Sequence, residues 1–373
     1  MDTCKLTELC RIQYGYAFDS ASFTEDASFP PLVRIRDVKR GFSETYYSGN
    51  YSQEYIVRRG DILIGMDGEF NIARWQSEPA LLNQRVCKII PNQQVDGSYL
   101  LFALTKILKK IEDKTAFVTV KHLSAKELNK IELRIPNYEQ QMQISSTLEK
   151  ALSIISRRQY QLAKLDELVK CHFVELFGDP VTNPKLWQLE KLVDLGELAR
   201  GISKYRPRNA PFLLNGPYPL IQTGDISNAG TYITDYTSSY SEEGLKQSKL
   251  WPSGTLVITI AANIAETSIL TFPACFPDSV VGFIAKENRV SSLFIHYWFT
   301  FFQQKLEHDA PQVAQKNINL KILSELLVIV PPVEVQLSFT SFVSRIDKLR
   351  VAVQASLDKT QQLFDSLMQE YFG

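Results

Sequence analysis

The residues with the most suggestive chemistry lie near the middle of the chain, in the segment ELFGDPVTNPKLW (175–187). Its Asn183-Pro184 pair begins like the Asn-Pro-Pro-aromatic tetrad of adenine methylation. In that tetrad the first residue and a proline carbonyl hold the target amine, and the aromatic ring stacks on the extruded base. Here Lys185 and Leu186 follow, so the second proline and the ring are missing. Because other turn formers surround the pair, we interpret the segment as a turn.

No other segment carries a complete catalytic pattern. GMDGEF (65–70) has two glycines but lacks the strand–loop–helix context of a cofactor site, and the chain contains no G-x-x-x-x-G-K-[ST]. Pro277-Asp278 is not followed at nuclease spacing by an acid-x-Lys pair. Carboxylates such as Asp37 and Asp61 are interpreted as surface charges. We therefore expect a binding protein with no catalytic residue, cofactor or metal of its own.

The cysteines and histidines predict neither a disulfide scaffold nor a metal centre. Five scattered cysteines lack C-x-x-C spacing, and four histidines form no H-E-x-x-H or similar set. Reduced thiols of a cytosolic protein explain this usage. No apolar run is long enough to span a bilayer, and the first residues lack a secretion signal, so a cytoplasmic protein without a membrane partner is expected.

Charge and length suggest a two-domain protein whose binding face is local. The 373 residues suffice for two ordinary domains. Lys plus Arg and Asp plus Glu number 41 each, so the net charge is zero. That balance argues against an overall basic surface but not against a local basic face. Residues 199–224 contain Arg200, Lys204, Arg206 and Arg208 and no acid, which fits either a solvated loop or such a face.

The chain contains an internal repeat. VKHLSAKELNKIELRIPNYEQQ (120–141) aligns without a gap with QKNINLKILSELLVIVPPVEVQ (315–336), at an offset of 195 positions. The same offset carries Phe177-Gly178 onto Phe372-Gly373. Two further pairs agree with shifted offsets: PLVRIRDV (31–38) with PLIQTGDI (219–226), and RRGDILIG (58–65) with PSGTLVIT (252–259).

Each half has the same expected order: a strand-rich segment, a short helix, a proline turn and a long helix. GDILIGMDG (60–68) and GTLVITIAA (254–262) are β-branched runs opened by glycine, which predicts buried strands. Residues 97–111 and 292–306 have helical apolar spacing. Aromatic residues of the second of these helices are assigned to the core, namely Tyr297, Trp298 and Phe301.

Heptad spacing predicts that both long helices belong to a coiled coil. Each would run for about 38 residues, or roughly 57 Å, and its single apolar seam needs a partner. The first seam is predicted at Leu148, Ile155, Leu162, Val169 and Leu176, with Leu152, Leu165 and Phe173 beside it. The second is predicted at Phe339, Ile346, Val353 and Leu367, with Phe342, Leu349 and Leu363 beside it and Ser356 and Thr360 as interruptions.

The expected fold class is α/β (α+β), with two similar domains and two long helices that pair antiparallel as a spacer related by a pseudo-twofold axis. The predicted boundaries are 1–137 for the first domain, 138–178 for the first helix, 179–332 for the turn and second domain, and 333–373 for the second helix. Two non-identical copies on a stiff spacer suit two separated sites on duplex DNA. A coiled-coil scaffold without a DNA role and a self-sufficient adenine-N6 methyltransferase remain as alternatives.

The chain resembles the specificity (S) subunit of type I restriction-modification systems over essentially its whole length. The resemblance rests on the duplicated layout, on Pro136-x-x-Glu139-Gln140 at the start of the first long helix, and on FGDPVTNPK (177–185) after it. The second copy keeps Pro331 and Glu334 but has Val335 in place of the glutamine, which puts a partner contact by Gln140 in doubt for that half.

The resemblance implies that each variable domain is a target recognition domain that reads one part of a split, asymmetric DNA site. It implies that the spacer helices dock two methyltransferase subunits, which use S-adenosylmethionine to methylate adenine N6. Catalysis, S-adenosylmethionine, ATP and Mg would belong to partner subunits in the cytoplasm of a bacterium or archaeon. The resemblance leaves open whether two ATP-dependent restriction (translocase and nuclease) subunits also join.

Candidate DNA contacts are polar side chains of the types that bind phosphates and base edges. Arginine and lysine contact phosphates and guanine, while asparagine and glutamine suit adenine. In the first domain we select Tyr16, Arg34, Arg36, Lys39, Arg40, Arg74, Gln84, Arg85 and Lys121. In the second we select Lys204, Tyr205, Arg206, Arg208, Gln222, Asn263, Lys316 and Asn317.

Overall fold

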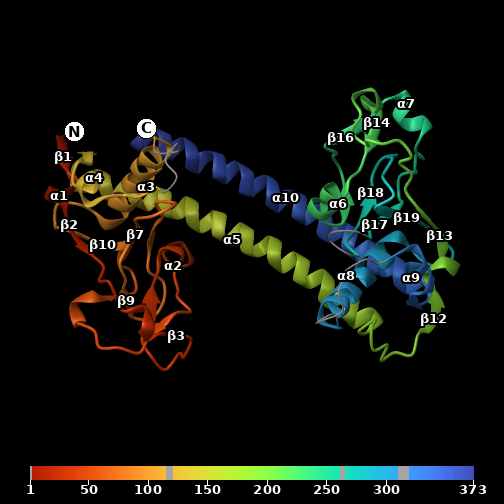
Figure 1. The fold of residues 1–373 in the computed structure, drawn as a ribbon, viewed down its shortest axis with the longest axis horizontal. Coiled ribbons are helices and arrows are strands. Elements are labelled where there is room, and N and C mark those ends of the chain that lie inside the picture. Colours follow the sequence, from red (N-terminus) through yellow and green to blue (C-terminus); the bar gives the residue numbers. More distant parts are fainter. Residues whose placement is uncertain (1, 115–120, 261–264, 310–318) are drawn as a thin grey trace. The chain divides into compact units, whose positions relative to one another are not determined.

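The computed structural model describes residues 2–114, 121–260, 265–309 and 319–373. These divide into two compact units (Figure 1). Unit 1 comprises Met1–Gln159 and Ala355–Gly373, and unit 2 comprises Tyr160–Gln354. Each unit is described by itself.

Unit 1 is a small mixed domain joined to one end of each long helix. Its elements are β1 (Asp2–Lys5), α1 (Leu6–Leu9), β2 (Cys10–Tyr14), β3 (Phe23–Thr24), β4 (Leu32–Val33), α2 (Ile35–Arg40), β5 (Tyr46–Tyr47), β6 (Ile56–Val57), β7 (Ile62–Gly65), β8 (Ile72–Arg74), β9 (Ala80–Leu82), β10 (Val86–Pro91), α3 (Gly97–Lys114), α4 (Ala125–Leu128) and β11 (Glu132–Ile135). The first part of α5 (Tyr138–Phe177) and the last part of α10 (Val333–Phe372) complete it.

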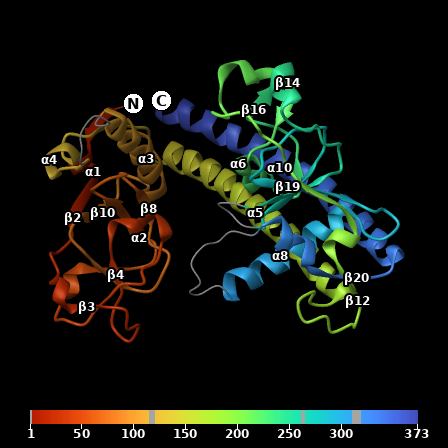
Figure 2. The same ribbon diagram turned by 45° about the vertical axis from the view of Figure 1, so that its right-hand side comes forward.

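A four-stranded antiparallel sheet in the order β2-β10-β7-β8 forms the centre of unit 1. Helix α3 covers it with a face of leucines four residues apart, Leu100, Leu104 and Leu108, which pack with Ile64 and Ile89 in one core. A second sheet, β4-β9-β6, carries a separate core. In both views β3 lies at the end of the unit away from α3 (Figures 1 and 2).

Unit 2 repeats this plan. Its elements are β12 (Gln188–Lys191), β13 (Gly196–Arg200), β14 (Leu214–Leu220), α6 (Thr223–Ala229), β15 (Tyr232–Ile233), β16 (Ser238–Tyr240), α7 (Glu242–Lys246), β17 (Leu256–Thr259), β18 (Thr267–Leu270), β19 (Val280–Ala285), α8 (Ser292–Asp309), α9 (Leu320–Glu325) and β20 (Leu327–Val330). The main sheet has the order β13-β19-β17-β18-β15. In both views β14 and α7 lie at the end of the unit away from α8 (Figures 1 and 2).

The predicted internal elements are confirmed. The buried strands expected at 60–68 and 254–262 appear as β7 and β17, and the helices expected at 97–111 and 292–306 appear as α3 and α8. Tyr297 and Trp298 are buried in the core of unit 2, and Phe301 stacks on Phe173 at 5.1 Å between ring centroids. The α/β (α+β) class with an internal repeat is therefore confirmed.

The two long helices run antiparallel within each unit. In unit 2, Phe173 of α5 meets Phe339 of α10 with ring centroids 5.4 Å apart, while Asp166 forms an ion pair with Arg350. Residue numbers thus rise along one helix as they fall along the other. In unit 1, Leu148 of α5 packs with Met368 of α10 in the same antiparallel sense.

Part of the predicted seam is wrong. Leu349 and Leu363 are 54% and 55% exposed, and Leu152 is 37% exposed. The buried positions of α10 are instead Phe339, Val343, Ile346 and Met368. A straight α-helix has 3.6 residues per turn, so a strict seven-residue count drifts off the buried face over several turns.

The segment after α5 is a turn, and its residues close the helix end. Gly178 has φ +78° and donates its N–H to Val174 O at 2.8 Å, as Gly373 does to Gln369 O at 2.9 Å. Lys185 Nζ donates to two of the last carbonyl groups of α5. Left-handed glycine is the usual helix stop, so this repeated end follows from local chemistry.

Candidate nucleic-acid interface

The candidate residues of unit 1 gather where two parallel strands end. β4 and β9 are parallel, with Val33 opposite Leu82, so Arg34 and Asn83 follow at the same edge of the sheet. We call the group formed by residues 15–16, 34, 66–67, 83–85 and 121–122 the first edge.

Tyr16 and Gln84 are held at the first edge by main-chain hydrogen bonds. Tyr16 donates its N–H to Leu82 O at 3.0 Å and accepts at its carbonyl from Gln84 N at 2.7 Å. A Cβ on the preceding Gly15 would lie 2.0 Å from Asn83 O, so only glycine permits this approach. The Tyr16 side chain is 51% exposed and presents an aromatic face to solvent.

Arg85 has an unusual backbone and two polar neighbours. Its φ is +69°, a conformation that non-glycine residues adopt at a cost. Arg85 Nη1 lies 3.2 Å from His122 Nδ1, and that nitrogen lies 2.5 Å from Asp67 Oδ1. Asp67 also pairs with Arg85 Nε at 3.5 Å. Asp67 and His122 belong to this edge but were not selected from the sequence, because the strand pairing that unites them is long-range.

Other selected cations of unit 1 are engaged. Lys121 pairs with Glu112 at 3.2 Å. Arg40 pairs with Glu44 at 2.9 Å, and its guanidinium lies 4.4 Å from the centre of the Phe42 ring. Arg36 Nη2 donates to Thr45 Oγ1 at 3.4 Å, while Lys39 is exposed on the same helix. These residues lie beside the first edge or along α2.

Arg74 lies apart from the first edge. It pairs with Ile62 at the beginning of β7, whereas the edge adjoins Gly65 at the other end of that strand. Its guanidinium donates to Gly60 O and to Ser98 Oγ, both at 2.9 Å. This arginine holds a turn against α3.

The surface carboxylate predicted at Asp37 is wrong. Asp37 is fully buried, and its Oδ2 accepts from Arg34 N at 2.9 Å. Its position at the third residue of α2 lets it cap the start of that helix. Asp61 is half-buried and pairs with Lys88 at 2.6 Å. Both carboxylates hold local structure.

Unit 2 has a second edge built from equivalent main-chain hydrogen bonds. We define it as residues 201–208, 222 and 277–279. The matching pairs are Gly15 N–Val86 O (3.0 Å) with Gly201 N–Val280 O (2.9 Å), Leu81 N–Pro31 O (2.7 Å) with Cys275 N–Pro219 O (2.8 Å), and Met66 N–Arg85 O (2.8 Å) with Ile260 N–Ser279 O (3.1 Å). Equivalent backbones therefore present different side chains.

Asp278 organises the arginines of the second edge. Its carboxylate forms ion pairs with Arg206 at 3.4 Å and with Arg208, and its main-chain oxygen accepts from Arg200. The basic cluster is therefore neither a plain solvated loop nor an unpaired cationic face. Asp278 was not selected from the sequence, although the repeat aligns it with Gln84 at the offset of 194 that relates β10 to β19.

Lys204, Tyr205 and Gln222 complete the second edge as exposed residues. The Tyr205 ring stands edge-on to Phe212, with centroids 5.0 Å apart. Gln222 Nε2 donates to Ser238 Oγ at 3.0 Å. The remaining selected residues, Asn263, Lys316 and Asn317, lie outside the described residues.

A family model described as the type I restriction modification DNA specificity domain matches residues 1–165 and 184–360. The chain belongs to this family. The two matched ranges correspond to the two copies of the repeat, so the predicted resemblance is confirmed. The protein is a specificity subunit of a type I restriction-modification system, and its function is DNA sequence recognition.

Individual relatives agree with this family. The specificity subunit of the EcoBI type I restriction enzyme from Escherichia coli is 28% identical over 402 residues, which cover 98% of this chain and 84% of that protein. The crystal structure of a type I restriction-modification S subunit from M. genitalium has a TM-score of 0.62 at 14% identity and covers 100% of this chain and 96% of its own. A structure from a study of complex assembly and conformational transition of the type I R-M system has a TM-score of 0.58 at 15% identity, covering 100% and 97%. These structural likenesses show a shared fold.

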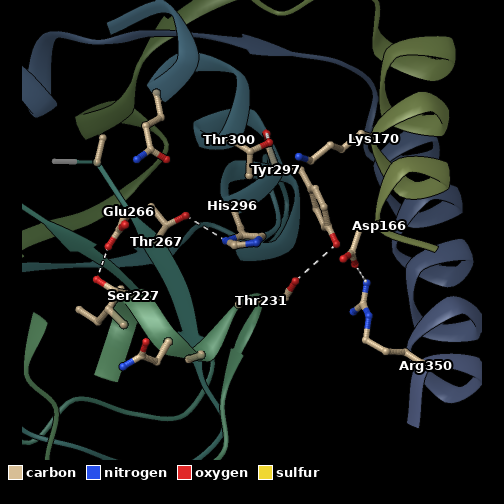
Figure 3. A pocket seen from close by; sticks show the side chains of 16 residues that line it. Asp166, Lys170, Ser227, Thr231, Glu266, Thr267, His296, Tyr297, Thr300 and Arg350 are labelled. Carbon is tan, nitrogen blue, oxygen red and sulfur yellow. Dashed lines mark hydrogen bonds and ion pairs between the residues drawn. The ribbon is translucent and has the colours of Figure 1, made fainter. Parts of the chain in front are cut away.

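Unit 2 of the specificity subunit also contains a cavity of about 530 Å³ beside α6 and α8. Its polar side chains are paired with one another as Asp166–Arg350, Thr231–Tyr297, Thr267–His296 and Ser227–Glu266 (Figure 3). Burial lowers the pKa of His296 to about 4, so its imidazole is neutral at physiological pH. These pairs support the packing of the second domain on the helices.

Thiol and metal chemistry find no support in the part of the chain that the structure describes. Burial raises the pKa of Cys10 to about 11 and that of Cys87 to about 12, so both thiols stay protonated. No group of three His, Cys, Asp or Glu side chains in that part is placed to hold a metal ion. Likewise, none of its helices is long and apolar enough to cross a membrane.

Proposed function

We propose that the specificity subunit reads a bipartite, asymmetric DNA site without catalysing a reaction itself. The observation that carries this proposal is the pair of edges, one in each unit, whose equivalent main-chain hydrogen bonds hold different exposed side chains. A repeated scaffold with different side chains would read two half-sites of different sequence. The mixed arginine, lysine, glutamine and tyrosine content suits phosphate and base contacts.

The long helices would dock two methyltransferase subunits and set the spacing of the half-sites. Exposed apolar side chains along α5 and α10 support a docking role, since solvent-exposed leucine, isoleucine and tyrosine side chains are costly unless a partner covers them. Examples are Ile154, Tyr160, Leu337, Leu349 and Val351, each at least 44% exposed. S-adenosylmethionine, ATP and Mg would be used by partner subunits in the cytoplasm, with restriction subunits as possible additions to the complex.

Methylation in cells tests the proposal directly. Co-production with the methyltransferase subunit of the same system, in a host without other adenine methylation, should give modified adenines at one bipartite motif. An unmodified genome would contradict a role in site recognition. Binding of S-adenosylmethionine by the purified chain alone, measured by calorimetry, would instead favour a self-sufficient methyltransferase. Failure of the assembled complex to bind duplex DNA in a salt-dependent way would favour a scaffold.

A further inference from the structure

Arg34 and Gln222 occupy the same position in the two edges. Each lies between a short strand and a short helix, and each donates its N–H to the aspartate three residues later. The distances are 2.9 Å from Arg34 N to Asp37 Oδ2 and 2.8 Å from Gln222 N to Asp225 Oδ2. The backbone at this position is therefore held in the same way in both units.

The strands before these two residues are paired alike. Leu32 lies opposite Leu81 in parallel register, and Leu220 forms a parallel bridge to Cys275. This pairing brings the residue at this position beside the turns 83–85 and 277–279. The position is set by pairing and capping rather than by its own side chain, which leaves that side chain able to make an outside contact.

The Arg34 guanidinium is available for such a contact. Arg34 is exposed, and its side chain has no hydrogen-bond or ion-pair partner among the residues that the structure describes. Its neighbours on α2 differ, because Arg36 is bonded to Thr45 and Arg40 to Glu44. Of these three arginines, Arg34 alone combines a fixed backbone at the edge with an unengaged head.

Gln222 is oriented for a two-point contact. One N–H of its amide donates to Ser238 Oγ at 3.0 Å, which limits rotation of the group. The second N–H and Oε1 have no partner within the described ranges and remain a donor and an acceptor side by side. Because Gly224 replaces the arginine found at position 36, Ser238 is free to accept this bond in unit 2.

We propose that Arg34 and Gln222 are equivalent specificity-determining residues, with Arg34 reading a guanine in one half-site and Gln222 reading an adenine in the other. Two guanidinium N–H groups match guanine O6 and N7, while an amide donor and acceptor match adenine N7 and N6 in the major groove. This inference rests on the proposed bipartite recognition. It adds which residue of each unit discriminates and for which base.

The test exchanges the two side chains in the complex with the methyltransferase subunit and maps modified adenines across the host genome. Arg34→Gln should weaken preference for one guanine by roughly 5- to 150-fold and leave the other half-site unchanged. Gln222→Arg should shift one adenine preference toward guanine in that other half. Arg34→Lys keeps the charge but lacks the two-point geometry, so it should also lose the preference. Lys39→Gln removes an exposed charge on the same helix and should keep the motif.

The outcomes separate this inference from the proposed function. An unmodified genome with the unaltered chain would contradict bipartite recognition itself. A normal motif with the unaltered chain, kept unchanged by both exchanges, would overturn only the assignment of Arg34 and Gln222. If a variant gives no methylation, selection of bound duplexes by the purified complex decides. Loss of preference at one base pair supports the assignment, whereas loss of binding to every duplex overturns it.

Discussion

A buried glutamine joins each domain to its long helix, and its removal should loosen that joint. In unit 1, Gln141 Oε1 accepts from Asp96 N at 2.8 Å, and Nε2 donates to Gln94 O at 3.2 Å and Pro136 O at 3.0 Å. In unit 2, Gln336 makes the same three bonds with Ser291 N (3.1 Å), Arg289 O (2.9 Å) and Pro331 O (2.9 Å). Both side chains are at most 2% exposed. Leucine at either position would leave three main-chain groups without a partner.

The expected loss of stability follows from those three groups. Each buried unsatisfied group costs about 1–3 kcal/mol, or roughly 3–9 kcal/mol together. Burial of leucine returns about 2 kcal/mol. Access of water to the start of each helix relieves part of the rest, so we expect a net loss of about 2–4 kcal/mol. For a unit of this size, that lowers the melting temperature by roughly 4–16 °C.

Calorimetry and hydrogen exchange should report this loss in Gln141→Leu and Gln336→Leu. The matched control is Gln140→Leu, one residue away but exposed, which should change stability by only about 0.5 kcal/mol. Exchange should accelerate at the amide of Asp96 in the first variant and of Ser291 in the second. If Gln141→Leu melts with Gln140→Leu and leaves the Asp96 amide protected, the three bonds do not stabilise the joint.

Three further expectations concern charge, pH and the turn after α5. Asp278→Asn should release Arg206 and Arg208, tightening binding of non-specific duplex at low salt and steepening the salt dependence by about one unit of slope per phosphate gained; Glu287→Gln is the control, and equal slopes would contradict it. His296, whose folded pKa is lowered to about 4, binds its proton more weakly than in the unfolded chain. Stability should therefore be intact above pH 6.5 and fall by roughly 3 kcal/mol as pH drops to 4, and His296→Gln should flatten this fall in urea titrations. Gly178→Ala should cost about 1–2 kcal/mol, because φ is +78° and the new Cβ would lie 2.8 Å from Pro184 Cγ. Gly224→Ala, which meets open space, should cost less in the same denaturation series.

Local patterns of the sequence were sufficient for the elements and for the repeat. Apolar periodicity located α3, α8 and both 40-residue helices, because one buried face imposes its spacing on neighbouring residues. The domain boundaries chosen from those patterns remain predictions. The same patterns placed Gln140 in the motif at the start of the first long helix, yet the buried partner of the loop is Gln141. A one-residue difference on a helix turns a side chain by about 100°, and only packing shows which side is covered.

The sequence by itself determined that this protein is a duplicated chain with two long helices and the motifs of a specificity subunit, because those features are encoded by neighbours along the chain. Only the tertiary structure decided which polar residues share an edge. Arg34 meets Asn83 through the parallel pairing of strands about fifty residues apart, and Asp278 meets Arg206 across 72 residues. It also separated Arg74, at the far end of β7, from arginines of the same type. Composition and spacing carry no information about such long-range pairing, because the pairing depends on how the whole unit packs.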